Sequence, residues 1–169
     1  WCADRRESKP FDHDAVREAL ATFEGVKRRF ELYINTPRQV YVDDYAHHPE
    51  ELRATITSLK AMFPGRRLTA VFQPHLFTRT RDLADGFAEA LSLADQVVLL
   101  PIYPAREEPI EGVVSEIIGD RLTVPWRICM REQLAETLAA MTTDVVATFG
   151  AGNIDACCDA VALTLKRKS

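Results

Sequence analysis

Two aspartates, a tyrosine and two histidines fall within six residues of this sequence, in the segment VDDYAHHP at residues 42–49. An aspartate carboxylate can accept both hydroxyls of a ribose, a tyrosine ring can pack on a base or a sugar, and an imidazole can bind phosphate or carboxylate. We expect one of the two aspartates to bind a ribose, Tyr45 to pack on a base or sugar, and His47 to bind phosphate or carboxylate. The structural alternative is that Asp43 caps the preceding strand and His48 is the N-cap of the following helix.

A second group of chemically useful side chains lies in QPHLFTRTRD at residues 73–82. We expect Arg79 and Arg81 at the start of a helix, where unpaired backbone N–H groups already favour an anion. A guanidinium there can hold a carboxylate or phosphate through two parallel hydrogen bonds, with His75 in the same loop. The structural alternative is that one arginine pairs with Asp82 or another surface acid while the other is solvated.

A metal site is a further interpretation, because Asp44, His47 and His75 could converge on one ion. The two histidines at residues 47 and 48 are adjacent rather than spaced i, i+4 on a helix. No other residue completes a ligand set, so we predict no resident metal.

The segment FGAGNID at residues 149–155 resembles a dinucleotide-binding glycine loop only in part. Asp155 stands where that fingerprint needs glycine or alanine, and the segment follows the last predicted strand instead of the first. We expect Gly150 and Gly152 to allow a tight strand-to-helix turn, with Asn153 as the helix cap. The sequence has no G-x-x-x-x-G-K-[ST] loop for a triphosphate and no nucleophile elbow.

The elements that must position these residues alternate between strands and helices. Period-2 runs on both sides of the turn NTPR predict a β-hairpin from residues 28–34 and 39–45. Apolar runs predict buried strands at residues 67–73, 95–102 and 144–150, with a further short strand at 125–130. Helical spacing predicts helices at residues 12–23, 50–63, 81–93, 115–121, 132–141 and 154–165.

This alternation predicts an α/β fold, with a Rossmann-like and mostly parallel sheet of about five or six strands. Helices cover both faces, and the N-terminal hairpin is antiparallel. Ligands of such sheets bind beyond the carboxyl ends of the strands. The chemically active segments all follow a strand, whereas connections such as PGRR and MTTD are plain turns, so we expect the site at that single edge.

Composition narrows the class of protein further. The chain has 169 residues, of which 47% are hydrophobic, and a net charge of −4. One domain of this size can bury a real core, and the acidic balance argues against a nucleic-acid partner. No apolar run approaches the length of a membrane span. Residues 1–11 are expected to be a linker or a cut edge, with one domain over residues 12–169.

Four cysteines stand at residues 2, 129, 157 and 158, with no C-x-x-C pair, so a zinc ribbon is excluded. Reduced thiols in the cytoplasm are the better expectation. Cys157 and Cys158 fall inside the last predicted helix, where we expect them to be buried.

The segments VDDYAHHPEEL, FQPHLFTRTRDL, YPAREEPIEG and FGAGNI, in this order and spacing, resemble the C-terminal domain of the Mur ligase family. The likeness covers roughly residues 12–168. It implies a Rossmann-like domain that closes over the active site of a cytoplasmic peptidoglycan-precursor ligase. The first two domains of the family, which bind the UDP-sugar and hold the ATPase P-loop, lie outside this chain.

The resemblance also implies a reaction and its partners. With ATP and Mg²⁺, the lactyl carboxyl of UDP-N-acetylmuramate becomes an acyl phosphate, which the amine of L-alanine attacks. On these motifs, Asp44 and Tyr45 correspond to nucleotide-side residues. His47 and Arg79 correspond to residues at the reacting centre and at the alanine carboxylate, with His75 beside them. The isolated domain is expected to be inactive and to contact the missing central domain.

One position departs from the family pattern, because many members have a second arginine where this chain has Leu76. Arg81 or Arg106 could replace it, or fewer charges hold the alanine. Two other functions are weighed. One is a murein peptide ligase, which shares the first motif but not HLFTRTRD. The other is a metal-dependent hydrolase or a stand-alone binding module.

Overall fold

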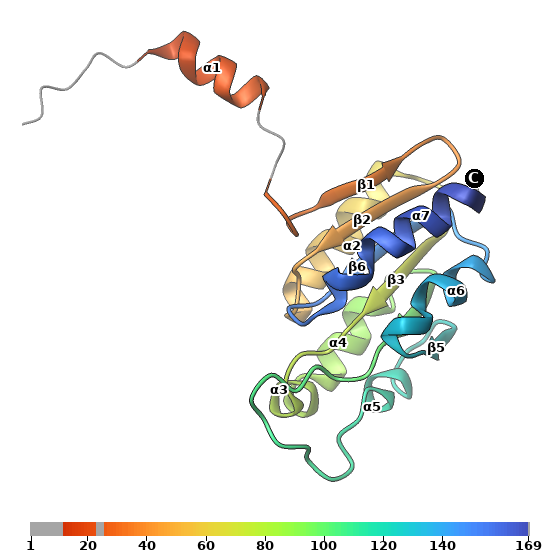
Figure 1. Ribbon diagram of the computed structural model, residues 1–169. Helices are drawn as coiled ribbons and strands as arrows, with labels where there is room; N and C mark the ends of the chain where they lie inside the picture. The colour runs from red at the N-terminus through yellow and green to blue at the C-terminus, as the bar shows by residue number, and fades with distance from the viewer. Residues whose placement is uncertain (1–11, 23–25, 169) are drawn as a thin grey trace, which may run out of the picture.

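The apolar strands of the sequence form a six-stranded sheet in the computed structural model, which describes residues 12–22 and 26–168 (Figure 1). The strand order is β1-β2-β6-β3-β4-β5. All neighbouring pairs are parallel except the hairpin pair β1–β2. The strands are β1 (Glu31–Asn35), β2 (Val40–Asp44), β3 (Leu68–Phe72), β4 (Gln96–Leu99), β5 (Trp126–Ile128) and β6 (Val145–Phe149). The predicted sheet and its antiparallel hairpin are confirmed.

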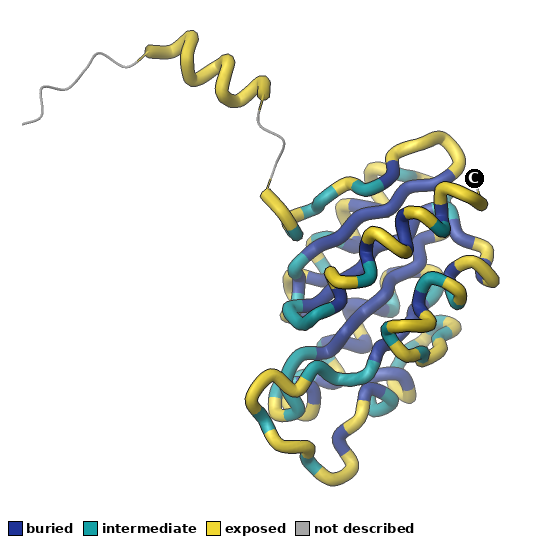
Figure 2. Tube along the Cα trace, in the orientation of Figure 1, coloured by how far each residue is buried: buried dark blue, intermediate teal, exposed yellow. Residues whose placement is uncertain are grey.

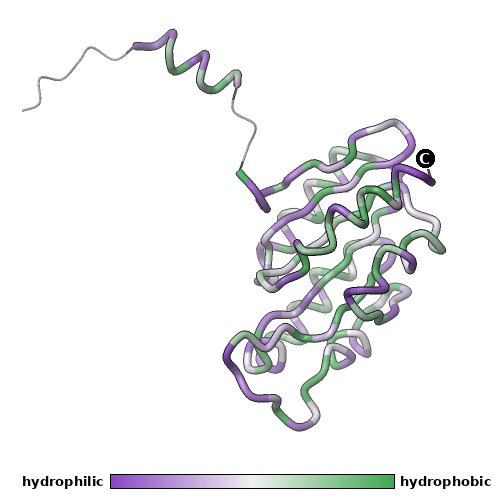
Figure 3. Tube along the Cα trace, in the orientation of Figure 1, coloured by the Kyte–Doolittle hydropathy of each residue, from purple (hydrophilic) through white to green (hydrophobic). Residues whose placement is uncertain are grey.

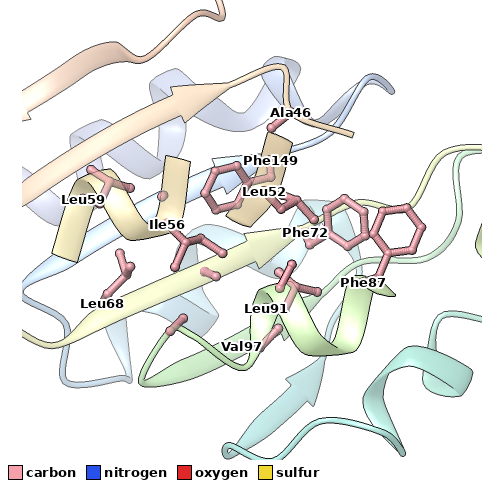
Figure 4. Close-up of a cluster of buried hydrophobic side chains, with 14 of the residues drawn as sticks. Ala46, Leu52, Ile56, Leu59, Leu68, Phe72, Phe87, Leu91, Val97 and Phe149 are labelled. Carbon is pink, nitrogen blue, oxygen red and sulfur yellow. The ribbon is translucent and has the colours of Figure 1, made fainter. Parts of the chain in front are cut away.

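Helices cover both faces of this sheet, because its central strands bury side chains in both directions (Figure 2). On one face lie α2 (Pro49–Met62), α4 (Ala84–Leu91) and α5 (Glu116–Gly119), whose buried side chains share one cluster with Val42, Phe72 and Phe149 (Figure 4). On the other lie α6 (Leu134–Ala139) and α7 (Cys158–Lys168), packed on Tyr41 and Val146. The hairpin turn and the last turn of α7 are hydrophilic (Figure 3).

Helix α2 begins as its sequence predicts. His48 is the N-cap, Pro49 occupies the first turn, and the His48 side chain and Glu51 form a reciprocal capping box. Leu52, Ile56 and Leu59 are buried as expected. Helical spacing also predicts Met62 on this face, but Met62 is the last residue of α2 and is 54% exposed.

Three helix boundaries differ from the sequence prediction. The helix expected at residues 81–93 is two helices, α3 (Phe77–Asp82) and α4, interrupted at Leu83. The last predicted helix opens with a 3₁₀ turn, η2 (Ile154–Cys157), and another, η1 (Arg131–Gln133), precedes α6. Such turns tighten helix ends where the chain leaves a strand or a loop.

Helix α1 (His13–Ala21) forms where helical spacing predicted it, with the Asp12 side chain accepting from the backbone N–H groups of Asp14 and Ala15. None of its residues is buried, and Leu20 is 70% exposed. Phe23, the last residue of the predicted helix, lies outside the described residues. Across the described ranges, every helix is too short or too polar to cross a bilayer.

Cys158 is buried as expected, whereas Cys157 is only half-buried and lies in the 3₁₀ turn η2. The Cys158 side chain lies in the cluster beneath α7, and the Cys157 thiol donates to the Ile154 carbonyl at 2.8 Å. Burial raises the pKa of Cys157 to about 11 and that of Cys158 to about 12.

We expect both thiols of the folded chain to resist alkylation by iodoacetamide at pH 8, because their raised pKa values leave almost no thiolate. A timed reaction followed by peptide mass spectrometry measures this. Unfolding in urea should make both residues react at the rate of ordinary thiols. Rapid modification of Cys158 in the folded protein would contradict its burial.

Candidate functional site

The carboxyl ends of the central strands meet at one edge of the sheet. In the register of β2, β6 and β3, Asp44 and Phe72 both lie opposite Phe149, so the three strands end level. The segments that follow, at residues 45–48, 73–76 and 150–153, therefore emerge side by side. Helix α7 follows β6 on one face while α2 and α4 follow β2 and β3 on the other, which makes this the switch point where α/β sheets bind ligands.

Asp44, at the end of β2, is held as a hydrogen-bond acceptor. One carboxylate oxygen accepts from the Phe30 backbone N–H at 2.9 Å, and the other accepts from that of Ala46 at 2.8 Å. Burial raises the pKa of this carboxyl, and the two hydrogen bonds oppose that rise. A carboxylate has about four acceptor positions, so Asp44 keeps capacity for ligand hydroxyls.

Asp43 has a structural role instead. It is fully buried, and its carboxylate accepts from the Thr148 hydroxyl at 2.7 Å and from Arg28 Nε at 3.2 Å. Asp43 and Arg28 form an ion pair, in which the Arg28 side chain is 17% exposed. The structural alternative predicted for Asp43 is the better description, although the contact is an ion pair rather than a strand cap.

Arg28 contacts several segments of the site, which the sequence did not indicate. Its guanidinium donates to the carbonyl of Gly150 at 2.5 Å and to that of Gly152 at 3.3 Å. It also lies 5.0 Å above the Tyr45 ring, and its own carbonyl accepts from the Tyr45 N–H at 2.7 Å. Sequence reasoning missed this residue, and the only signal was a pair of adjacent arginines before the hairpin.

His47 presents one ring nitrogen to a ligand. Its Nδ1 lies 3.0 Å from the Tyr45 carbonyl oxygen. Because a carbonyl can only accept, the proton in this contact is on Nδ1, and Nε2 is the ring nitrogen that remains for a ligand. The ring is also edge-on to Tyr45 and to His75, with centroids 5.2 and 6.5 Å away, so the loops after β2 and β3 meet here.

The neighbouring residue, His48, serves the helix. Its Nδ1 accepts from the Glu50 N–H at 3.4 Å, while the Glu51 carboxylate accepts from the His47 and His48 N–H groups. Burial alone would raise the pKa of Glu51, but these hydrogen bonds and the nearby imidazoles lower it. The structural alternative for His48 is thus confirmed, and the capping box also holds the backbone of His47.

His75 stacks on Tyr103, which lies in the segment after β4. The ring centroids are 5.7 Å apart, and the backbones of the two residues form a parallel bridge. Burial lowers the pKa of His75, and the positive charge of Arg79 lowers it further, so the ring is neutral at pH 7. Its Nδ1 is buried and has no hydrogen-bond partner.

Arg79 lies inside α3 and carries the feature that points most directly to a ligand. One terminal guanidinium nitrogen, Nη1, is buried without a hydrogen-bond partner. Leaving a charged donor unsatisfied costs about 1–3 kcal/mol or more, so such groups are rare unless a ligand or water completes them. A carboxylate matches the guanidinium in charge and planar geometry.

The other two arginines do not share this position. Arg81 is exposed and pairs with Asp82 at 2.7 Å, because two residues along a helix place it about 200° around the axis from Arg79. Arg106 is exposed in the segment after β4. The structural alternative therefore holds for Arg81 but not for Arg79.

The start of α3 already holds an anion from the chain itself, the Glu107 carboxylate. The N-cap residue is Leu76, with φ +71° and no side-chain acceptor. The first-turn N–H of Thr78 instead donates to the Glu107 carboxylate at 3.0 Å. The helix terminus is occupied, so the positive charge offered to a ligand comes from Arg79 alone.

The glycine turn after β6 fits tightly against β3. A Cβ at Gly150, whose φ is +145°, would lie 2.8 Å from the Gln73 carbonyl oxygen, and one at Gly152 would lie 2.7 Å from Tyr103 Cβ. Asn153 occupies the N-cap position of η2, but its side chain accepts from Gln73 Nε2 at 2.9 Å and caps nothing. The predicted tight turn is confirmed and the predicted cap is wrong.

The convergence of Asp44, His47 and His75 on a metal is not seen. Both Asp44 oxygens face backbone N–H groups, and the His47 Nδ1 is taken by a carbonyl. Within the described ranges, no cluster of three or more His, Cys, Asp or Glu residues is arranged to hold an ion. The edge therefore offers acceptors and a ring at residues 44–45, an imidazole acceptor at His47 and a guanidinium at Arg79.

A family profile for the Mur ligase, glutamate ligase domain matches residues 28–152, which include every site segment. The UDP-N-acetylmuramate–L-alanine ligase of Parabacteroides distasonis is 52% identical over 148 residues, or 87% of this chain and 31% of the relative. The chain thus spans about a third of the length of the curated relatives it matches.

Two solved structures share the fold. The UDP-N-acetylmuramate–alanine ligase of Thermotoga maritima has a TM-score of 0.72 at 28% identity, over 94% of this chain and 34% of that one. A murein peptide ligase of Psychrobacter arcticus has a TM-score of 0.65 at 22% identity, over 88% and 32%. At that identity the second likeness shows the fold alone.

We expect Arg28→Ala to lower the free energy of unfolding by about 3–5 kcal/mol, because it leaves the buried Asp43 carboxylate without its ion-pair partner. Urea denaturation of the chain followed by circular dichroism measures the change. The matched control is Lys27→Ala, an exposed neighbour, which should stay within about 0.5 kcal/mol of the wild type. Equal effects of the two variants would contradict a structural role for Arg28.

Proposed function

The chain belongs to the Mur ligase family, and from this premise we propose that it is the C-terminal domain of an ATP-dependent ligase that joins L-alanine to UDP-N-acetylmuramate. The observation that carries the proposal is the unpartnered guanidinium nitrogen of Arg79, in a chain 52% identical to an alanine ligase. A buried charged donor of this kind is completed well by an anion, and the amino acid supplies a carboxylate.

The amino acid would lie between the loops after β2 and β3. Arg79 binds its carboxylate through two parallel hydrogen bonds. Neutral His75 lies beside this ion pair, where a charged imidazole would compete for the carboxylate. His47 Nδ1 contacts the Tyr45 carbonyl, so Nε2 would be the nitrogen that orients the amine or, in the neutral ring, takes a proton from it.

ATP would meet the other side of the same edge. The remaining acceptor positions of Asp44 fit a pair of ribose hydroxyls, and the Tyr45 ring fits a base or sugar face. The sequence has no P-loop, and the described residues include no acidic cluster for Mg²⁺, so triphosphate and cation fall to the central domain. Bound there, ATP supplies the phosphoryl group that activates the lactyl carboxyl.

The function of this domain is then positioning. Formation of the amide bond depends on holding two bound reactants in contact while phosphate charge develops. A domain that brings Arg79 and His47 against the central domain meets that need, and its closure shields the activated carboxyl from water. The enzyme would act in cytoplasmic peptidoglycan synthesis, with this domain occupying residues 12–169.

We expect Arg79→Ala in the full-length protein to raise the KM for L-alanine by roughly 10- to 100-fold, because it removes a charged pair of hydrogen bonds. The KM for ATP should change little. Steady-state phosphate release with varied alanine measures both constants, and Arg81→Ala, which removes an exposed arginine of the same helix, is the control. An unchanged alanine KM, or a preference for a tripeptide acceptor over alanine, would reject the proposal.

We also expect the isolated 169-residue chain to show no alanine ligation, because in this family the P-loop and the UDP-sugar site lie in the two other domains. Incubation with ATP, Mg²⁺, UDP-N-acetylmuramate and radiolabelled alanine, followed by chromatography of the product, tests this. The full-length protein serves as the positive control. Product formed by the isolated chain would mean that the whole site is contained within it.

A further inference from the structure

Helix α3, which carries Arg79, begins without a cap of its own. Its N-cap residue is Leu76, whose apolar side chain offers no acceptor and whose backbone has the left-handed φ of +71°. The first N–H groups of a helix need an acceptor from elsewhere. A non-glycine residue in this conformation is also strained, and surrounding contacts must offset that strain.

Glu107 supplies that acceptor from a segment about thirty residues further along the chain. Its carboxylate accepts from the Thr78 N–H at 3.0 Å and from the Thr78 hydroxyl at 2.5 Å. The hydrogen bonds from Thr78, together with one from the Phe77 N–H, hold the pKa of Glu107 below its usual value. The charged carboxylate is therefore bound at the start of α3 at neutral pH.

The rest of this segment is joined to the same loop. The Leu76 N–H donates to the Tyr103 carbonyl at 2.9 Å, and the Tyr103 N–H donates to that of Pro74 at 2.8 Å. With the stacking of His75 on Tyr103, these contacts fix the backbone up to Leu76. Glu107 then fixes the first turn of α3, in which Arg79 is the third residue.

We propose that Glu107 is a positioning residue for Arg79, which sets the first turn of α3 so that the guanidinium meets the carboxylate of the amino-acid substrate. This inference rests on the proposed function. Glu107 does not contact the substrate. It acts by orienting the helix, and its own charge is engaged by Thr78, so it leaves the buried Arg79 nitrogen free for a ligand.

The test is Glu107→Ala in the full-length protein, with Glu108→Ala as the matched control, since Glu108 is the exposed acidic neighbour. We expect the alanine KM to rise by about three- to tenfold for Glu107→Ala, as the loss of a helix cap predicts. The KM for ATP should stay close to that of Glu108→Ala. A purely structural role would instead alter the KM values for alanine and for ATP together.

Introducing Glu107→Ala into the Arg79→Ala background gives the decisive comparison. If Glu107 acts through Arg79, the second substitution adds no further rise in the alanine KM. Independent, additive effects, or no difference between Glu107→Ala and Glu108→Ala, would overturn the inference while leaving the role of Arg79 intact.

Hydrogen exchange separates failure of this inference from failure of the proposed function. In the full-length protein, the peptide covering residues 76–80 should exchange faster in Glu107→Ala than in Glu108→Ala. Equal exchange overturns the positioning role whatever the substrate. If exchange is faster but the protein does not ligate alanine, the positioning role of Glu107 stands and only the proposed substrate is rejected.

Discussion

The buried ion pair between Arg28 and Asp43 connects parts of the chain that approach one another only in the folded state. Arg28 precedes the hairpin, Asp43 lies on β2, and the same guanidinium binds two carbonyls of the turn after β6. The Tyr45 ring lies beneath the same guanidinium. The segments before β1, after β2 and after β6 are therefore joined by one charged side chain. Removing Arg28 would leave the buried Asp43 carboxylate with only the Thr148 hydroxyl as a partner and would break the contacts to both carbonyls.

The second half of the edge is organised to keep a positive charge available. Arg79 is partly buried, and its unpaired nitrogen has neither a carboxylate nor a carbonyl as partner. The acid at the start of its helix, Glu107, is engaged by Thr78, and the neighbouring imidazole of His75 is neutral. The unpaired nitrogen is tolerated in the free domain at some cost in stability, and this pattern is common where a protein prepares a site for a ligand.

The sequence predicted the helix starts and turns that are set by residues close together in the chain. Proline and acidic residues behind His48 predicted the start of α2, and the glycines at residues 150 and 152 predicted a tight turn. The start of α3 could not be found this way, because Leu76 has no capping side chain and the acceptor, Glu107, is remote in sequence. The cap predicted for Asn153 failed for the same reason, since its partner Gln73 lies in the loop after β3, remote in sequence.

By itself, the sequence determined the alternation of strands and helices, the edge at which polar residues collect, and the ordered motifs that resemble one ligase family. It did so because periodicity, turn chemistry and motif spacing are properties of contiguous residues. Only the tertiary structure decided which of two aspartates is free, which of two arginines is unpaired, and which residues hold them. Those outcomes depend on Arg28, Thr148 and Glu107, whose contacts exist only once distant segments pack together.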